Sequence, residues 1–180
     1  MKKNVLMAAL IAVLAFGLFS CNKDEASKKD LLTREGGWQL AEGTITPAFE
    51  MNDGTMVSDI MDYLYVCEKD DEILFNADGS EIITTNVTCA EGEGIQGDKV
   101  AALWKFDNDE EPTTLFCQLP FIYDYDNEGN VTGYSQVQEN CKILDITKDE
   151  LVISYTVIAA KGDQYTFKMT FKDPKKVAKK

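Results

Sequence analysis

Residues 164–172 limit the fold more than any other part of the chain, because apolar and polar side chains alternate along them with a period of two. The odd positions carry large apolar or aromatic residues: Tyr165, Phe167, Met169 and Phe171. The even positions between them carry Thr166, Lys168 and Thr170. This period is typical of a strand with one buried and one solvated face, so the segment predicts an antiparallel sheet.

Strand-like runs fill most of the remaining chain, and short turns separate most of them. We expect these runs at residues 38–46, 72–75, 81–88, 99–106, 113–123, 131–138, 141–147, 151–160 and 164–172. The run at 141–147 either continues the run before it or begins the next. No helical crossover is expected, and a meander closes most simply as a barrel. The sequence therefore predicts an all-β fold, an eight-stranded antiparallel up-and-down barrel, in preference to a Greek-key sandwich.

The first long loop, residues 47–66, does not follow the strand pattern. Pro47 is expected to end the first strand. Apolar residues then recur at spacings of three and four, which predicts a short amphipathic helix in this loop: Met56, Val57, Ile60, Met61 and Leu64. The helix could lie as a lid near an opening or simply pack on the core. A short helical turn is also expected at residues 30–32.

Residues 1–20 have the three parts of an export signal. Lys2 and Lys3 precede an apolar run, and the small residue Ser20 precedes Cys21. The run is too short for a comfortable transmembrane helix. Leu18-Phe19-Ser20-Cys21 resembles the bacterial lipobox, which implies cleavage before Cys21 and lipid on its sulfur and amine, a firm anchor. An ordinary secretory signal that happens to leave a cysteine is the alternative.

The segment after Cys21 is short and polar, as expected of a tether. Lys23-Asp24-Glu25 resembles the export signal of surface lipoproteins in Bacteroides-type bacteria, although a plain solvated tether fits equally well. We therefore expect a lipoprotein signal peptide at residues 1–20, a tether at 21–30, a barrel domain at 31–173 and a basic tail at 174–180. The expected location is the outer membrane, with the cell surface as one possible face.

Four cysteines remain once Cys21 is assigned to lipid, and an even number in an exported protein predicts disulfides. Cys67 and Cys89 are centred on residue 78, and Cys117 and Cys141 on residue 129. Both centres lie in turn sequences. Residues equidistant from a hairpin turn lie opposite each other, close enough for a disulfide. The spacing therefore predicts the pairs Cys67–Cys89 and Cys117–Cys141.

Charge and composition exclude several classes of function. The net charge is −13, and it becomes −15 when the two lysines of the signal are removed, so nucleic acid is not an expected partner. The chain has no histidine, and Arg34 is its one arginine, which removes the usual hydrolase triads and most zinc sites. Asp124, Asp126 and Glu128 begin like a calcium loop, but Ser135 replaces the required glutamate. We expect no enzyme, metal or cofactor.

Several segments together resemble the lipocalin-like lipoproteins of Bacteroides-type bacteria, over roughly residues 31–173. They are Gly36-Gly37-Trp38 after Asp30-Leu31-Leu32, residues 67–71 with 74–79 and Cys89, and residues 143–151. The resemblance implies an eight-stranded barrel with one closed and one open end. In lipocalins a late arginine lies across the tryptophan; no arginine follows Arg34, so Lys168 or Lys172 would have to take its place.

Two functions follow from this reading. The first is a membrane-anchored protein that binds one small, largely apolar ligand in its barrel, with the 56–64 helix near the mouth. The expected lining residues, each of which could equally be core packing, are Trp38, Trp104, Phe121, Tyr155, Phe167 and Met169. The second is a protein-interaction or inhibitor module that acts through its loops and has a filled barrel. The expected partners are a membrane, through lipid on Cys21, and the ligand; the protein is expected to be a monomer.

Overall fold

The structure is a computed structural model that describes residues 26–51, 53–64, 68–84, 99–119, 123–125, 131–134, 138–158 and 162–177. The predicted signal peptide, Cys21, Cys67, Cys89, Phe121 and residues 126–130 of the acidic turn lie outside these residues. Within them, no helix has both the length and the apolar character needed to cross a membrane.

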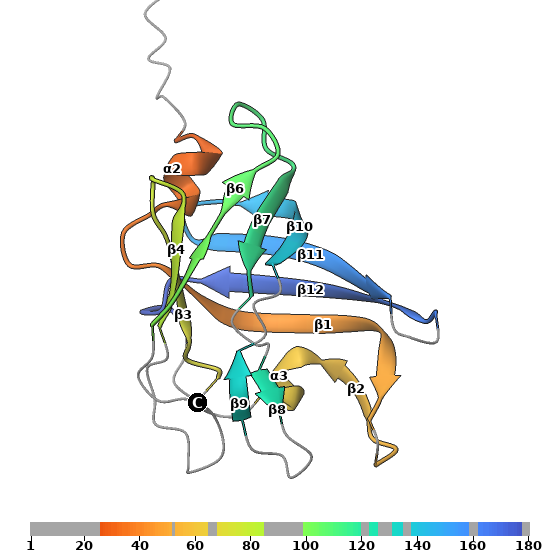
Figure 1. Cartoon of the computed structure of the whole chain (residues 1–180). Helices are drawn as coiled ribbons and strands as arrows, with labels where there is room; N and C mark the ends of the chain where they lie inside the picture. The colour runs from red at the N-terminus through yellow and green to blue at the C-terminus, as the bar shows by residue number, and fades with distance from the viewer. Residues whose placement is uncertain are drawn as a thin grey trace, which may run out of the picture.

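Antiparallel strands make up almost all of the described chain (Figure 1). The two short helices are α2 (Lys28–Leu32) and α3 (Ile60–Tyr63). The strands are β1 (Trp38–Glu50), β2 (Met56–Asp59), β3 (Glu72–Phe75), β4 (Ser80–Thr84), β5 (Lys99–Leu103), β6 (Lys105–Phe106), β7 (Thr114–Gln118), β8 (Tyr123–Tyr125), β9 (Val131–Tyr134), β10 (Gln138–Ile146), β11 (Glu150–Ile158) and β12 (Gln164–Lys172).

The main sheet has the hydrogen-bonded order β5-β4-β3-β1-β12-β11-β10-β7-β6, with β2 attached to β1. The two ends of this order are neighbours in the chain, because only Trp104 separates β5 from β6. β5 pairs with β4, whereas β6 pairs with β7. The nine strands of that order therefore occupy eight strand positions in a nearly closed barrel, because β5 and β6 together fill one position. This confirms the predicted antiparallel up-and-down barrel.

The inner face of the barrel follows the period of two in the sequence. Met169 and Phe171 of β12 are buried, and they lie opposite Ile153 and Leu151 of β11, which are also buried. The β3–β4 hairpin pairs Ile73 with Ile83, so it is centred on residue 78 as predicted. Cross-strand apolar pairs of this kind stabilise the pairing of neighbouring strands and exclude water from the core.

The first long loop differs from the prediction in two ways. β1 does not end at Pro47 but continues to Glu50, and residues 56–59 form β2 instead of the first part of a helix. The pairing of β1 with β12 ends at Thr46, and its register with β2 shifts between Thr44 and Phe49. Pro47 therefore lies where no ladder hydrogen bond needs its missing N–H.

Only Ile60–Tyr63 of the predicted helix is helical, and Ile60 is its buried side chain among those described. Ile60, Val57 and Leu64 are buried in the same apolar cluster as the barrel core. Gly43 of β1 makes this approach possible: a Cβ on it would lie 2.6 Å from Cδ1 of Ile60. The stripe thus packs against the core, one of the two arrangements that the sequence left open, except for Met56, which is 60% exposed.

Helix α2 and Trp38 form one end of the barrel, which we call the closed end. Ser27 caps α2, accepting from the N–H of Asp30 at 3.1 Å. Trp38 has 0% exposure, and its indole N–H donates to the carbonyl of Leu32 at 2.8 Å. The carbonyls at the end of a short helix lack partners within it, so the indole both fills the core and satisfies one of them.

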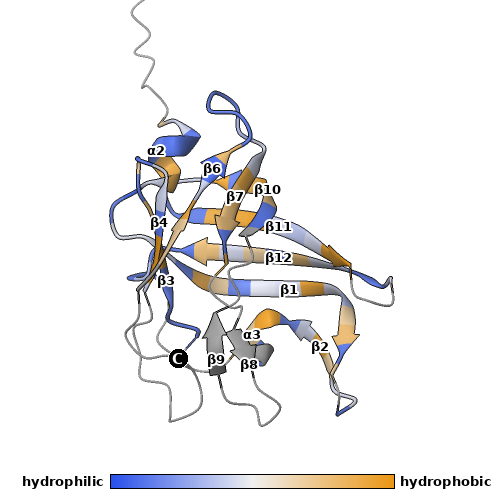
Figure 2. Cartoon of the chain, in the orientation of Figure 1, coloured by the Kyte–Doolittle hydropathy of each residue, from blue (hydrophilic) through white to orange (hydrophobic). Residues whose placement is uncertain are grey.

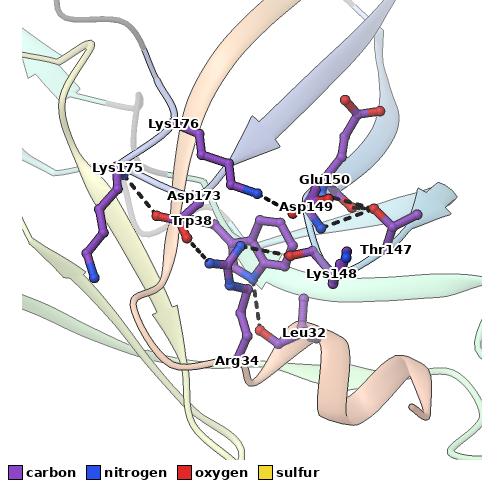
Figure 3. Close-up of polar contacts among 10 residues, drawn as sticks. All are labelled: Leu32, Arg34, Trp38, Thr147, Lys148, Asp149, Glu150, Asp173, Lys175 and Lys176. Carbon is purple, nitrogen blue, oxygen red and sulfur yellow. Dashed lines mark hydrogen bonds and ion pairs between the residues drawn. The ribbon is translucent and has the colours of Figure 1, made fainter. Parts of the chain in front are cut away.

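Arg34 covers Trp38 from outside, as Figure 3 shows. Its guanidinium carbon is 4.9 Å from the centroid of the indole, and Nη1 donates to the carbonyl of Lys148 at 3.2 Å. Nη2 forms an ion pair with Asp173. One side chain therefore ties the chain before β1, the β10–β11 turn and the end of β12 to the same ring.

The prediction that Lys168 or Lys172 would replace a late arginine is wrong. Lys172 extends outward and pairs with Glu42 at 3.0 Å, and Lys168 is exposed. The position across the tryptophan is taken by Arg34, which comes before Trp38 in the chain. An arginine therefore does stack on Trp38, but it comes from the segment just before β1.

Replacing Arg34 should destabilise the barrel. Arg34→Ala removes the stack, the Asp173 ion pair and the bond to the Lys148 carbonyl, so we expect a loss of about 1–3 kcal/mol in the free energy of unfolding. Urea unfolding followed by circular dichroism measures this loss. Arg34→Lys is the matched control: it keeps the charge but has no planar group, and it should recover less than half of the loss. A change within about 0.5 kcal/mol for Arg34→Ala would contradict the role assigned to the stack.

Candidate functional site

The barrel interior is fully buried near α2, but its aromatic side chains become partly exposed toward the other end. Tyr155 and Phe167 are stacked there, with centroids 4.9 Å apart and ring planes 10° apart. Phe49 meets Tyr165 edge to face, with centroids 6.2 Å apart. We call these four residues the aromatic rim. Partly exposed rings on an inward face offer apolar contact area to a small molecule.

The rim lies beside an apolar strand end. The C-terminal end of β11 is hydrophobic in Figure 2, and Ile158 is 71% exposed there. The β11–β12 ladder extends from Glu150 at the closed end to the Ile158–Gln164 pair. Apolar surface is therefore exposed at the end of the ladder away from Trp38.

The predicted lining residues divide between the two ends of the barrel. Trp38, Trp104 and Met169 are buried in the core. The Trp104 indole N–H donates to the carbonyl of Asn76 at 2.9 Å, which fixes it to the β3–β4 turn. Tyr155 and Phe167 belong to the aromatic rim, and Phe121 lies outside the described residues. A ligand role for this set stays a prediction.

Glu81 is a buried acid on the inner face of β4. It lies between Phe75 of β3 and Ala102 of β5 in the strand pairing and has 0% exposure. Its Oε2 accepts a hydrogen bond from the backbone N–H of Gln118 at 3.0 Å. Among the described residues, its Oε1 has no hydrogen-bond partner. Burial raises the pKa of Glu81 to about 8, and the Gln118 N–H only partly opposes this rise.

The role of Glu81 follows from the change of partner between β5 and β6, because β5 pairs with β4 and β6 pairs with β7. The β6–β7 pairing ends at Lys105 and Phe116, and Gln118 lies two residues further along β7. The N–H of Gln118 has therefore passed the end of β6, and the carboxylate of Glu81 reaches from β4 to accept from it. The Glu81 side chain therefore replaces a backbone hydrogen bond that the strand pairing lacks here. We call this place the Glu81 seam.

Cys117 and Cys141 are buried thiols that touch but do not lie directly opposite each other. Glu139 is opposite Cys117, and Leu115 is opposite Cys141, so the predicted direct opposition of the two cysteines is wrong. The hairpin is not one continuous ladder, because β8 and β9 form a separate sheet with a register shift between Asp124 and Tyr125. Residues at equal distances from the centre of this turn, such as Cys117 and Cys141, are therefore not opposite each other.

The structure describes both residues as unbonded thiols, and a disulfide between them stays a prediction. The hydrogen bond to Cys141, together with burial, raises the pKa of the Cys117 thiol well above its usual range. A thiol held protonated in this way is a poor nucleophile, so the pair does not have the character of a catalytic cysteine. Cys67 and Cys89 lie outside the described residues.

Together these groups form what we call the polar row: Glu81, Cys117, Cys141, Glu139 and Tyr155. The charges of Glu81 and Glu139 act on the pKa of Cys117, and burial, then Cys141 and Glu139, raise the pKa of Tyr155. Burial also raises the pKa of Glu139. The row therefore leads from the Glu81 seam to the aromatic rim.

The row has one electrostatic character. Each of its members is neutral or negative, and no lysine or arginine is among the described groups that shift its pKa values. Within the described residues, no cluster of three or more His, Cys, Asp or Glu side chains could hold a metal ion. The described groups of the row therefore offer hydrogen-bond donors and acceptors but no positive charge.

Sequence reasoning missed Glu81, Phe49 and Tyr165. A signal for Glu81 was present, because it lies two residues before the buried Ile83 and thus shares the inner face of β4. Tyr165 also follows the period of two in its strand. Phe49 could not be found in this way, since it depends on β1 continuing past Pro47. Gln118 is a further buried polar residue, whose role depends on the same strand pairing.

Comparison with known proteins finds similarity to solved structures but no matching family. No protein-family model matches the chain, and no curated protein matches it. A deswapped triple mutant of bovine odorant-binding protein is 13% identical, with 76% of this chain and 71% of that chain covered and a TM-score of 0.37. A dog lipocalin allergen is 9% identical, with the same coverages and a TM-score of 0.36.

Bovine odorant-binding protein in complex with a selenium-containing odorant is also similar, at 13% identity. The match covers 84% of this chain and 76% of that chain, with a TM-score of 0.35. Likeness at this level carries no argument about function. The barrel described above rests on the strand pairing itself.

The buried acid should make stability depend on pH. Between pH about 4.5 and about 8 the folded chain keeps the Glu81 proton that the unfolded chain releases, so stability falls as pH rises through that window. The loss is on the order of 3–5 kcal/mol across it. Glu81→Gln keeps an acceptor for the Gln118 N–H but does not titrate, so its stability relative to the unaltered protein should improve from pH 5 to pH 8.

Urea unfolding at several pH values measures this difference. Glu139→Gln is the matched control, and it should show a smaller change because Glu139 is only partly buried. Parallel pH profiles for Glu81→Gln and the unaltered protein would show that Glu81 titrates normally in the folded state.

Proposed function

We propose that the protein is a lipid-anchored, lipocalin-like binding protein that holds one small, largely apolar molecule in its barrel. The observation that carries the proposal is the aromatic rim, where Tyr155, Phe167 and their neighbours are partly exposed on the inward face of β11 and β12. Eight-stranded barrels are wide enough to hold one small ligand. The closed end is packed around Trp38, so the ligand would enter from the rim.

A binding role agrees better with the polar row than catalysis does. The hydrogen bond to Cys141 and burial hold the Cys117 thiol protonated, and burial raises the pKa of Glu81 to about 8, so neither group is a ready nucleophile at neutral pH. Such groups are well suited to orient a bound molecule by hydrogen bonds. The protein is thus proposed as a carrier or receptor and not as an enzyme.

The anchor part of the proposal comes from the sequence around Cys21. Cleavage before Cys21 and lipid on it would hold the barrel at the outer membrane through the tether, as a monomer, on the periplasmic or the outer face. The ligand would then be met at a membrane surface outside the cytoplasm. This setting favours apolar molecules, since they concentrate at membranes.

A protein-interaction module is the second candidate. The exposed apolar side chains of Val157 and Ile158 at the β11 end, and of Leu103 and Leu144 elsewhere, favour it. Apolar surface at loops and strand ends is a common docking feature. A protein that carries no ligand but captures a partner through these positions would fit this second reading.

Native mass spectrometry of the protein purified from its own host should show a bound small molecule that is released on unfolding. Phe167→Ala should weaken binding of an apolar fluorescent probe such as N-phenyl-1-naphthylamine by about tenfold, because a stacked ring is lost. Lys168→Ala is the matched control on the outer face and should leave the affinity unchanged. If no ligand and no probe binds, the barrel is not a binding site of this kind.

Cys21→Ser should abolish membrane attachment. Metabolic labelling with a radioactive or alkyne-tagged fatty acid, followed by membrane fractionation, measures the change in a bacterium that processes lipoproteins. The unaltered chain should be labelled and membrane-bound, and its mature N-terminus should be blocked by acylation. A soluble, unlabelled mature chain that begins at Cys21 would support the ordinary secretory signal instead.

A further inference from the structure

We propose that Glu81 is the polar anchor for the barrel's ligand, and that this ligand is a largely apolar molecule that carries an amine. The proposal rests on the proposed function and specifies the chemical class of its ligand. Its geometric basis is that one oxygen of a fully buried carboxyl is fixed by the protein while the other is left for a donor.

The carboxyl of Glu81 is held in place from one side only. Oε2 accepts from the Gln118 N–H at 3.0 Å, and this bond fixes the side chain across the seam between β4 and β7. Oε1 has no partner among the described residues, although Glu81 has 0% exposure. A buried oxygen without a hydrogen bond is costly, and most such groups in native proteins are satisfied. In the ionised form of Glu81 the partner that Oε1 lacks is a donor, and a ligand could supply it.

The surroundings select the charge of that donor. Cys117 on β7, Cys141 and Glu139 on β10, and Tyr155 on β11 are the described titratable groups linked to Glu81 along the polar row. None of them carries a positive charge that could pair with a fatty-acid carboxylate, and the ionised forms of Glu81 and Glu139 would repel it. An ammonium group would instead bring positive charge and three donors to an acidic protein of net charge −13.

The row also gives the ligand a direction. Its apolar part would lie against Tyr155 and Phe167 at the rim, where rings are partly exposed. Its amine would point along Cys141 and Cys117 toward Glu81. An amphiphilic amine would therefore bind with its apolar part at the rim and its amine at the seam. The reverse orientation is not expected, because the rim offers ring faces and the seam offers the acceptor.

Binding of an amine should be linked to pH. Without ligand, burial raises the pKa of Glu81 to about 8, so the carboxyl keeps its proton at neutral pH. An ammonium group beside it favours the carboxylate, and an alkylamine stays charged to pH about 10. Amine binding should therefore release a proton and become tighter as pH rises from 6 to 9.

The test compares three ligands that share one hydrocarbon chain: decylamine, decan-1-ol and decanoate. Each is measured by displacement of N-phenyl-1-naphthylamine from the full mature chain at pH 6, 7, 8 and 9. The variants are Glu81→Gln, which keeps the acceptor for the Gln118 N–H, and Glu139→Gln, which removes a less buried carboxyl on the same row. Circular dichroism confirms that each variant is folded, and the comparison of the three ligands on the unaltered protein needs no variant.

We expect decylamine to bind the unaltered protein at least about tenfold more tightly than decan-1-ol at pH 8, and decanoate to bind most weakly. Glu81→Gln should reduce the amine preference to about one, while Glu139→Gln should keep most of it. Equal binding of amine and alcohol, or a preference that survives Glu81→Gln, would overturn the assignment to Glu81 and leave the binding function standing. Absence of binding by every ligand and by the probe would overturn both.

Discussion

The barrel closes through one strand that divides its hydrogen bonds between two neighbours. β5 pairs with β4, β6 pairs with β7, and Trp104 lies at the bend between them. Trp104 is fixed there by its backbone N–H, which donates to the carbonyl of Gly79, and by its indole N–H, which donates to the carbonyl of Asn76, both at 2.9 Å. The bend leaves the N–H of Gln118 without a strand partner, and Glu81 supplies the acceptor. A polar side chain is therefore needed inside an otherwise apolar barrel, because the closure of the sheet requires it.

Side-chain packing differs between the two ends of the barrel. At the closed end, Trp38 is buried beneath Arg34 and bonded to the end of α2, so this part resembles a solid core. At the other end, Tyr155 and Phe167 are stacked yet partly exposed, and Ile60 inserts over Gly43 close by on β1. The polar row connects the two regions. In the proposed binding mode, a ligand that enters at the rim would reach Glu81 while the packing around Trp38 stays unchanged, which is the usual division between a rigid scaffold and its binding site.

Much of this fold could be predicted from local pattern. The period of two in residues 164–172 gave the bounds of β12, and the turn at residue 78 gave the register of the β3–β4 hairpin. The errors came from long-range effects. Pro47 does not end β1, because its missing N–H falls at a register shift. Arg34 lies across Trp38, where the resemblance to lipocalins implied Lys168 or Lys172. The acceptor role of Glu81 could not be predicted at all, since it depends on where β6 stops pairing with β7.

The most direct test of this account is the titration of Glu81 by carbon-13 NMR of its side-chain carboxyl, assigned by comparison with Glu81→Gln. The account predicts a midpoint near pH 8 in the ligand-free protein and a fall of that midpoint when decylamine is added. A midpoint near the ordinary value for glutamate, unchanged by the amine, would show that Glu81 is solvated in the folded protein and would contradict both the seam and the ligand site built on it.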